Sequence, residues 1–517
     1  MIKGHILPPS FKITNEKIVQ RHMNACCLAD FFRLYPDSFS SVEGFVLSEY
    51  YGEFRKFINE RQDSLMHILY ESIPAELHSK IDKWLNELSS ENGNLYDAYV
   101  QTINDIDQLE KYSDELKKSG TPQELRMAAN VQNAINTIKD TDILSFLSRK
   151  SILPKYGFPV DSVELFTSPA SYSFQNTSKL RLSRDLAIAI AEYAPDSEVI
   201  ADGKLYKSRY IKMPPKKNHA LIEKSFAICT NPECGCVNTA LSRTDLQYQC
   251  KICGSDVELM GNYIVPQYGF VSELRSKKAT MKKPDRTYRG DVHYIGNSSG
   301  DTEEFKIGEI IVTVTKTKDD ELLIMNRTPF HMCKSCGFTV RNNGGLNELS
   351  QYKKEQHRSS EGRVCTNKLF EKVYLGHELK TDVAIISISK PFQSDQALSV
   401  LYALLEGVSS YYSIERKDIS GCLYYSRIDG KLHTVFVLYD TVPGGAGHVS
   451  RITNGGDNEL LAVLKEAYKV VDECNCGGDE GNGACYSCLC NYENQRVHDR
   501  LNRGLAKRYL SEILELD

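Results

Sequence analysis

Cysteine side chains occur in this sequence as closely spaced pairs, which is the usual pattern of a metal site. The chain has 517 residues and 16 cysteines. Near its C-terminal end a Cys-x-Cys pair and a Cys-x-x-Cys pair flank a Gly-rich loop, and two such pairs can direct four thiolates at one tetrahedral ion. We therefore predict a zinc site there, and its ligands are Cys474, Cys476, Cys485 and Cys488. Cys490 is the spare fifth cysteine of this cluster.

A second set of paired cysteines lies near the middle of the chain. The two pairs are about fifteen residues apart with short predicted strands between them, which is typical of a zinc ribbon. The predicted ligands are Cys229, Cys234, Cys250 and Cys253. Cys236 is the alternative to Cys234. We prefer Cys234 because the glycine after it permits the tight turn that aims backbone amides at sulfur.

A third candidate site begins with Cys333-x-x-Cys336. Its partners are less evident from spacing, and we predict a Cys3His zinc site completed by His357 and Cys365. His331 is the competing histidine. The three sites together imply about three zinc ions per chain, one for each set of four ligands.

Four protein ligands leave no open position on zinc for water, so all three sites are predicted to be structural. The weak candidates for catalysis are Asp440 and His448, which flank a Gly-rich turn after a predicted strand. Asp382 and His377 form a second acid–imidazole pair. Glycines at such a turn permit a phosphate to approach the backbone. A structural aspartate that caps the turn is the simpler interpretation, so we expect no catalytic residue.

The end of the chain resembles a known family. Asp-Thr-x-Pro-Gly-Gly-Ala-Gly at 440–447, a predicted helix, and the cysteine pairs at 474–488 are similar to the zinc-binding domain that ends mitomycin-repair-factor-type superfamily-two (DEAD/DEAH-like) DNA helicases. Relatives of that domain occur in phage-defence proteins. The family pattern also has a histidine followed by a cysteine where His357 and Cys365 stand.

Earlier segments resemble the part of the same helicases that follows the second motor domain. They are Arg21-His22-x-Asn24-Ala25, Leu153 to Pro159, Arg184 to Ala187, Glu192 to Pro195 and Gly203 to Tyr206. The resemblance covers nearly the whole chain. It implies the C-terminal half of such a helicase, either as part of a longer chain or as a separate subunit.

The sequence lacks the residues of an ATPase motor. A helicase needs a Gly-x-x-x-x-Gly-Lys-Ser/Thr loop to neutralise nucleotide phosphates, and no such run occurs here. The implied function is a non-catalytic, zinc-stabilised nucleic-acid-binding accessory module in DNA repair or phage defence. Its implied partners are single-stranded or forked DNA and a helicase ATPase. The alternatives are a nuclease-like hydrolase that uses Asp440 and His448, or a docking scaffold for a motor subunit.

Basic residues flank the zinc ribbon, with tyrosines between them. Cations bind phosphates and aromatic rings stack on bases, so this segment is a candidate single-strand site. The predicted nucleic-acid-binding residues are Arg181, Arg184, Lys207, Arg209, Lys277, Lys278, Lys282 and Lys283. A solvated lysine-rich loop is the alternative.

The elements that must position these residues form a multidomain α+β protein. Residues 1–175 are predicted to be a helical helicase-associated region, and residues 176–290 a basic segment with the zinc ribbon. Residues 291–380 are predicted to be β-rich with the second zinc site, and residues 381–517 a mixed α/β zinc-binding domain. A helix is expected from Thr121 to about Arg149, and two strands are expected around a turn at Lys318 to Asp320.

Composition excludes several classes of protein. The net charge is −5, so a nucleic-acid site must be a local patch. No run of about eighteen uncharged apolar residues occurs, which predicts no membrane span. Because the cysteines are paired at metal-binding spacings, we expect zinc thiolates in a reducing cytoplasm rather than disulfides.

Overall fold

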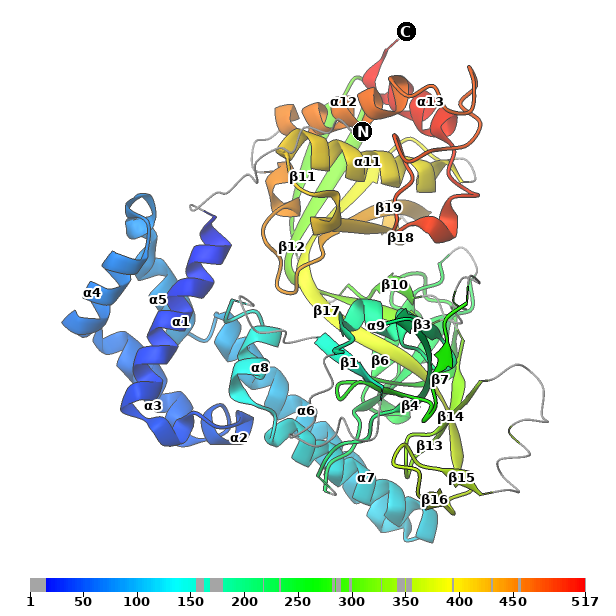
Figure 1. The fold of residues 1–517 in the computed structure, drawn as a ribbon. Coiled ribbons are helices and arrows are strands. Elements are labelled where there is room, and N and C mark those ends of the chain that lie inside the picture. The colour runs from blue at the N-terminus through cyan, green and yellow to red at the C-terminus, as the bar shows by residue number, and fades with distance from the viewer. Residues whose placement is uncertain are drawn as a thin grey trace.

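The computed structural model describes residues 15–516, except for residues 155–161, 168–179, 217, 232–233, 281–283, 285–289, 297–299, 327, 342–348, 350–355, 393–394, 429–430 and 454–456. A helical region comes first, a β-rich region follows, and an α/β region with the last cysteine cluster ends the chain (Figure 1). The predicted fold class is confirmed. Most of the motif at 153–159 lies outside the described residues.

The N-terminal region is built from eight described helices. They are α1 (Glu16–Leu34), α2 (Val42–Phe45), α3 (Glu49–Glu60), α4 (Asp63–Ser72), α5 (Ile81–Ser89), α6 (Asn94–Ser119), α7 (Pro122–Lys139) and α8 (Ile143–Arg149). An aromatic core that includes Phe31, Phe45 and Phe54 holds the first of them together, and these rings are fully buried. Helices α6 and α7 form a long antiparallel hairpin (Figure 1).

The helix expected from Thr121 to Arg149 is two helices. Its start is as predicted, because the Thr121 hydroxyl accepts the amide of Glu124 at 3.3 Å. It ends at Lys139, and α8 begins after Asp142, whose carboxylate accepts the amide of Ser145 at 2.9 Å. A second N-cap therefore divides the predicted helix.

Two sheets make up most of the β-rich region. The smaller has the order β2-β1-β8-β4-β3, with β9 beside β4, and α9 (Leu186–Glu192) follows β2. Its strands are β1 (Ser162–Phe166), β2 (Ser183–Asp185), β3 (Glu198–Ala201), β4 (Lys204–Ile211), β8 (Phe270–Ser272) and β9 (Lys277–Lys278). The larger has the central order β10-β12-β17-β7-β5-β6. Its strands are β5 (Glu223–Cys229), β6 (Val237–Ala240), β7 (Val257–Ile264), β10 (Gly290–Tyr294), β11 (Asp301–Ile307), β12 (Ile310–Asn326), β13 (Phe330–Cys333), β14 (Thr339–Arg341), β17 (Phe370–Ile388), β18 (Ile419–Ile428) and β19 (Lys431–Asp440).

Two long strands connect the β-rich region to the C-terminal region. Strand β12 is continuous from Ile310 to Asn326 and pairs with β17 on both sides of a register shift between Thr317 and Asp320. The turn expected at Lys318 to Asp320 is therefore wrong, because β17 pairs along both halves of β12 and the irregularity is a bulge within one strand. Strand β17 extends from the C-terminal sheet into the β-rich region (Figure 1).

The C-terminal region places three helices over its part of the large sheet (Figure 1). They are α11 (Gln396–Tyr412), α12 (Asp457–Asp472) and α13 (Arg503–Leu514). Apolar side chains of all three pack on β12, β17 and β19 in one buried cluster. The hairpin expected around Asp429-Gly430 pairs Ile428 with Lys431, although its two turn residues lie outside the described part of the chain.

The predicted domain division remains a prediction. Its last boundary, after residue 380, falls inside β17. No helix of the described residues is long and apolar enough to cross a membrane.

Candidate metal centres and nucleic-acid interface

The C-terminal cysteine cluster lies in the loop between α12 and α13. The Sγ atoms of Cys474 and Cys485 are 3.6 Å apart, and those of Cys476 and Cys488 are also 3.6 Å apart. The ligand atoms of all four residues lie within 4.8 Å of one another. Cys490 is buried beside them but is not a member of this group.

The zinc-ribbon cysteines are brought together by strands β5, β6 and β7. The Sγ atoms of Cys229 and Cys253 are 3.4 Å apart, and those of Cys234 and Cys250 are 3.7 Å apart. The structure groups Cys234, rather than Cys236, with the other three. Cys236 is buried, and its sulfur lies 3.7 Å from the carbonyl oxygen of Val237.

The predicted Cys3His site lies between β13 and the short strands β15 (His357–Arg358) and β16 (Val364–Cys365). The Sγ atom of Cys333 is 3.9 Å from that of Cys365, and Nε2 of His357 is 3.2 Å from Sγ of Cys336. The imidazole of His357 is buried and stacks on Phe338. The four-ligand group of the described residues contains His357 and not His331.

The three groups suit zinc. Four thiolates at about 2.3 Å from one tetrahedral ion lie roughly 3.8 Å from one another. Most of the sulfur–sulfur distances above are close to that value, and they far exceed the ~2.05 Å of a disulfide. All 16 cysteines are free thiols. Zinc bound by these sets would crosslink the elements that carry the ligands, and the donor atoms leave it no open coordination position.

A buried arginine joins the C-terminal cysteine loop to helix α12. The guanidinium of Arg503, at the start of α13, donates to three backbone carbonyl oxygens. They belong to Val471 at 2.9 Å, Cys476 at 3.0 Å and Gly478 at 2.9 Å. Arg503 is 4% exposed. Sequence reasoning did not single out this residue, because its spacing from the cysteines carries no motif.

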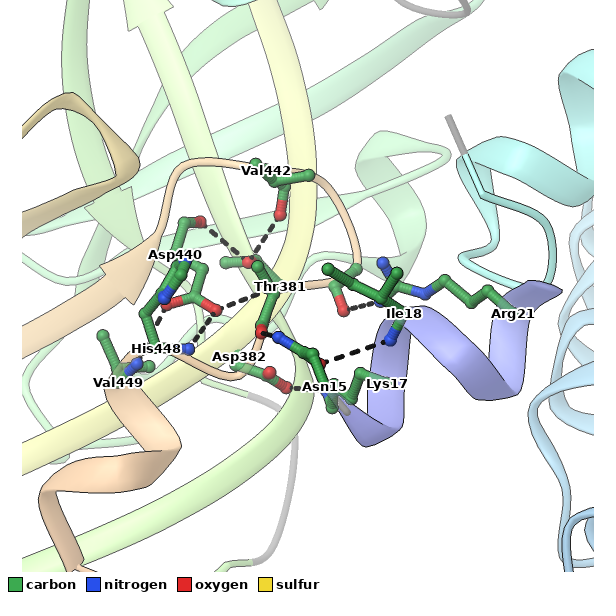
Figure 2. A network of polar contacts seen from close by, with 12 residues as sticks. Asn15, Lys17, Ile18, Arg21, Thr381, Asp382, Asp440, Val442, His448 and Val449 are labelled. Carbon is green, nitrogen blue, oxygen red and sulfur yellow. Dashed lines mark hydrogen bonds and ion pairs between the residues drawn. The ribbon is translucent and has the colours of Figure 1, made fainter. Parts of the chain in front are cut away.

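Asp440 is fully buried at the end of β19. Its carboxylate accepts backbone amides of the turn that follows, from Ala446 at 2.6 Å, His448 at 3.0 Å and Val449 at 3.0 Å (Figure 2). The contact to His448 is through the backbone, so the structure gives no Asp–imidazole hydrogen bond between the two weak catalytic candidates. The observed bonds are those of a carboxylate that shapes a turn.

This turn contacts the first helix of the chain (Figure 2). The side-chain amide of Asn15 donates to the carbonyl of Ala446 at 2.9 Å, and the guanidinium of Arg21 donates to the carbonyl of Gly444. Lys17 forms an ion pair with Asp382 on β17. Burial raises the pKa of the Asp382 carboxyl, and the ammonium of Lys17 partly offsets that rise.

Two glycines permit this close approach. Gly444 and Gly445 have φ of +75° and +69°, which glycine adopts without strain. A Cβ atom on Gly445 would lie 2.3 Å from Oδ2 of Asp382, and one on Gly444 would lie 2.0 Å from Oγ of Ser151. The glycine-rich turn therefore brings the C-terminal region against the helical region.

The predicted nucleic-acid residues fall into two electrostatic groups. Lys207 is 2.7 Å from the carboxylate of Asp196, and Arg209 contacts Asp196 at 3.1 Å and Glu273 at 3.2 Å. Arg184 pairs with Glu192 at 3.1 Å. The charges of these three cations are therefore largely neutralised within the fold.

The second group is exposed. Lys277 and Lys278 form β9, and the register places Lys278 directly opposite Lys204 of β4. Within the described residues none of these three lysines has an ion pair. Arg181 is also exposed, whereas Lys282 and Lys283 lie outside the described residues. Lys204 was missed as a site residue because only strand register brings it to Lys278.

Parts of this chain are similar to known proteins. Residues 400–489 match the family described as the MrfA Zn-binding domain, a range that includes most of α11, the β18–β19 hairpin, α12 and the C-terminal cysteine cluster. Over 584 aligned positions the chain is 21% identical to the Druantia protein DruE of Escherichia coli (strain UMEA 4076-1), with 99% of this chain and 30% of DruE covered. Residues 400–489 therefore carry an MrfA-type zinc-binding domain.

Two solved structures are also similar. One is described as the DUF1998 helicase MrfA bound to DNA, and it is 12% identical with a TM-score of 0.34, over 77% of this chain and 43% of MrfA. The other is described as MrfA bound to DNA and AMPPNP, and it is 10% identical with a TM-score of 0.24, over 77% of this chain and 41% of MrfA. The chain thus spans less than half the length of each of these relatives.

Proposed function

We propose that this chain is a zinc-stabilised nucleic-acid-binding module that serves a superfamily-two DNA helicase. The observation that carries the proposal is the exposed lysine group of β9 and β4 on a chain that contains an MrfA-type zinc-binding domain. Like charges directly opposite each other on paired strands are destabilising, and a phosphate backbone would remove that repulsion. The ligand would be single-stranded or forked DNA.

Zinc has a structural role in this proposal. The ions would be held by the three four-residue groups, each of which crosslinks the strands or loops that carry its ligands. The protein would act in DNA repair or phage defence, in the cytoplasm, together with a helicase ATPase. Chemical work on ATP would come from that ATPase, because this sequence has no phosphate-binding loop.

DNA binding to the lysine group can be tested by fluorescence anisotropy over a range of salt concentrations. On a single strand the slope of log K against log salt is about −0.7 for each phosphate contact. The Lys277→Ser/Lys278→Ser variant is expected to bind single-stranded and forked DNA more weakly, whatever the sequence, with a shallower slope. The matched control is Lys56→Ser/Lys117→Ser, which removes two exposed lysines that have partners in Glu53 and Asp114.

Three results would contradict the proposal. Equal affinity and equal slope for the lysine variant and the parent would leave a docking scaffold for a motor subunit as the better function. DNA-stimulated ATP turnover by the purified chain, free of contaminating ATPases, would contradict an accessory role. Magnesium-dependent DNA cleavage that EDTA stops would favour the nuclease-like alternative.

A further inference from the structure

A polar cleft lies between the helical region and β17, and the lysines of β9 are not among its lining residues. Its volume is about 530 Å³, which is within the roughly 300–1,000 Å³ of common ligand sites. Helices α1, α5 and α6, the residues 150–152 that follow α8, and one residue of β17 line it. More cations than carboxylates line the cleft. The cations are Lys17, Arg21, Lys83, Lys150 and Lys380, and the carboxylates are Glu16, Glu87 and Asp97.

Several of these charges already have partners. Lys17 pairs with Asp382, and Glu16 pairs with Lys80. Glu87 is 3.8 Å from Lys83 and accepts a hydrogen bond from Gln20 at 2.8 Å. Arg21 donates to the backbone carbonyl of Gly444, and none of these ion pairs involves Lys150 or Lys380.

Lys150 and Lys380 converge on one neutral atom. The Nζ atom of Lys150 donates to Oε1 of Gln101 at 3.1 Å, and that of Lys380 donates to the same oxygen at 2.8 Å. An amide oxygen carries no net charge and cannot neutralise two ammonium groups. Each ammonium has three donors, so donors remain for a further acceptor.

The ionisable groups around Lys150 act on its pKa in both directions. Asp105, Lys224 and Glu321 are the other ionisable groups whose charge affects Lys150. Burial, and after it the ammonium of Lys380, lower the pKa of Lys150 to about 8. Glu321 and Asp105 act in the opposite direction, and Lys224 is itself bonded to Glu378 at 2.7 Å. Lys150 therefore still carries most of its charge at neutral pH.

Two buried polar atoms of the cleft lining also lack a partner. Oδ1 of Asn24 and Oγ of Ser151 make no hydrogen bond, although the two residues are 8% and 5% exposed. An unsatisfied buried polar atom costs about 1–3 kcal/mol unless something binds to it. Asn24 and Ser151 line the same cleft as the two lysines.

We propose that this cleft binds a phosphate group, held by Lys150 and Lys380, with Ser151 donating its hydroxyl hydrogen and Asn24 accepting from a hydroxyl or amine of the same ligand. Phosphate supplies the negative charge that Gln101 lacks, and charge-assisted hydrogen bonds are the strong ones. The phosphate can belong to a free nucleotide or to a nucleic-acid strand. This inference does not rest on DNA binding at β9.

The test uses the full chain, with zinc bound, and three probes. Inorganic pyrophosphate and ADP represent free phosphates, and a single-stranded DNA oligonucleotide represents the backbone. Binding is measured by isothermal titration calorimetry. We expect pyrophosphate to bind the parent chain, with an affinity that falls as the pH rises through about 8, where Lys150 loses its proton. Competition by the oligonucleotide assigns the site to nucleic acid, and binding of ADP without such competition assigns it to a nucleotide.

The sharpest variant is Gln101→Glu. It keeps the shape of the side chain and places a carboxylate between the two ammonium groups, so the chain should melt at a higher temperature while pyrophosphate binding is lost. Lys380→Gln is the second variant and should weaken binding about tenfold or more, as expected for loss of a charge-assisted hydrogen bond. Lys277→Ser/Lys278→Ser should leave pyrophosphate binding unchanged, which separates this site from the lysines of β9.

Two outcomes overturn the inference. One is the absence of binding by any of the three probes to the parent chain at millimolar concentration. The other is a folded Gln101→Glu or Lys380→Gln protein that binds pyrophosphate as tightly as the parent. Circular dichroism and zinc content of each variant establish that it is folded.

Discussion

The ammonium group of Lys17 forms an ion pair with the carboxylate of Asp382, which is fully buried on β17 and 365 residues away in the sequence. The pair joins the first described helix to the strand that enters the C-terminal sheet. It lies beside the bonds from Asn15 and Arg21 to the glycine-rich turn (Figure 2). The helical region and the C-terminal region are therefore held together by buried or half-buried polar contacts.

Removing the cation of this pair should destabilise the protein. Lys17→Met leaves the Asp382 carboxylate buried without its counter-ion, and we expect a loss of about 3 kcal/mol in the free energy of unfolding at neutral pH. Urea denaturation measures the loss. Lys56→Met is the control, because Lys56 pairs with Glu53 on the surface and should change stability little.

The same variant should show a characteristic pH dependence. Burial raises the folded-state pKa of Asp382 above its ordinary 3.8, and removal of Lys17 raises it further. Between the two pKa values the folded state holds more protons than the unfolded state, so this group lowers stability as the pH rises. The difference between Lys17→Met and its parent should shrink as the pH falls, since a protonated Asp382 needs no counter-ion. A constant difference from neutral to acid pH would contradict this assignment.

Asp440→Asn tests whether the aspartate shapes the turn or performs chemistry. The variant loses the charge that three backbone amides share, and we expect a loss of about 2 kcal/mol in stability. Hydrogen exchange should show weaker protection of the amides of Ala446, His448 and Val449. If stability and DNA binding are unchanged and function in cells is abolished, Asp440 has a catalytic role and the hydrolase alternative gains support.

The zinc clusters predict distinct outcomes for neighbouring cysteines. We expect three zinc ions per chain by elemental analysis. Cys485→Ser should lose one ion and expose the amides of β19 to exchange, because folding of the C-terminal region and zinc binding are coupled. Cys490→Ser should keep all three ions, since Cys490 lies outside the four-ligand group. Loss of zinc from Cys490→Ser with retention by Cys474→Ser would reverse the ligand assignment.

Arg503 should matter for zinc as well as for stability. Arg503→Lys keeps a positive charge but cannot supply the fork of donors that reaches three carbonyl oxygens. We expect it to lose roughly 3 kcal/mol of stability, because buried backbone oxygens lose their partners. A competing chelator should also remove zinc from it faster than from the parent. Arg508→Lys, on the same helix, is the matched control.

Local patterns in the sequence predicted many of the elements and the paired cysteines, whereas the partners of Cys333 and Cys336 were less evident from spacing. The cysteine pairs occur at fixed short spacings because a tight turn must place both thiolates on one ion, so they are visible without a fold. The N-cap at Thr121 is likewise local, because it depends on residues within one helical turn. The one long helix and the β12 turn were wrong because a second N-cap and the pairing of β12 with β17 outweighed local propensity.

Only the tertiary structure decided which distant residues meet. The ion pair of Lys17 with Asp382, the convergence of Lys150 and Lys380 on Gln101, and the opposition of Lys204 to Lys278 all depend on how helices and strands pack. The tertiary structure also showed that Asp196 and Glu273 neutralise the charges of Lys207 and Arg209, whereas the lysines of β9 are exposed. The sequence determines the sign of each charge. The partner of each charged side chain is set by packing, because packing brings together residues that are far apart in the chain.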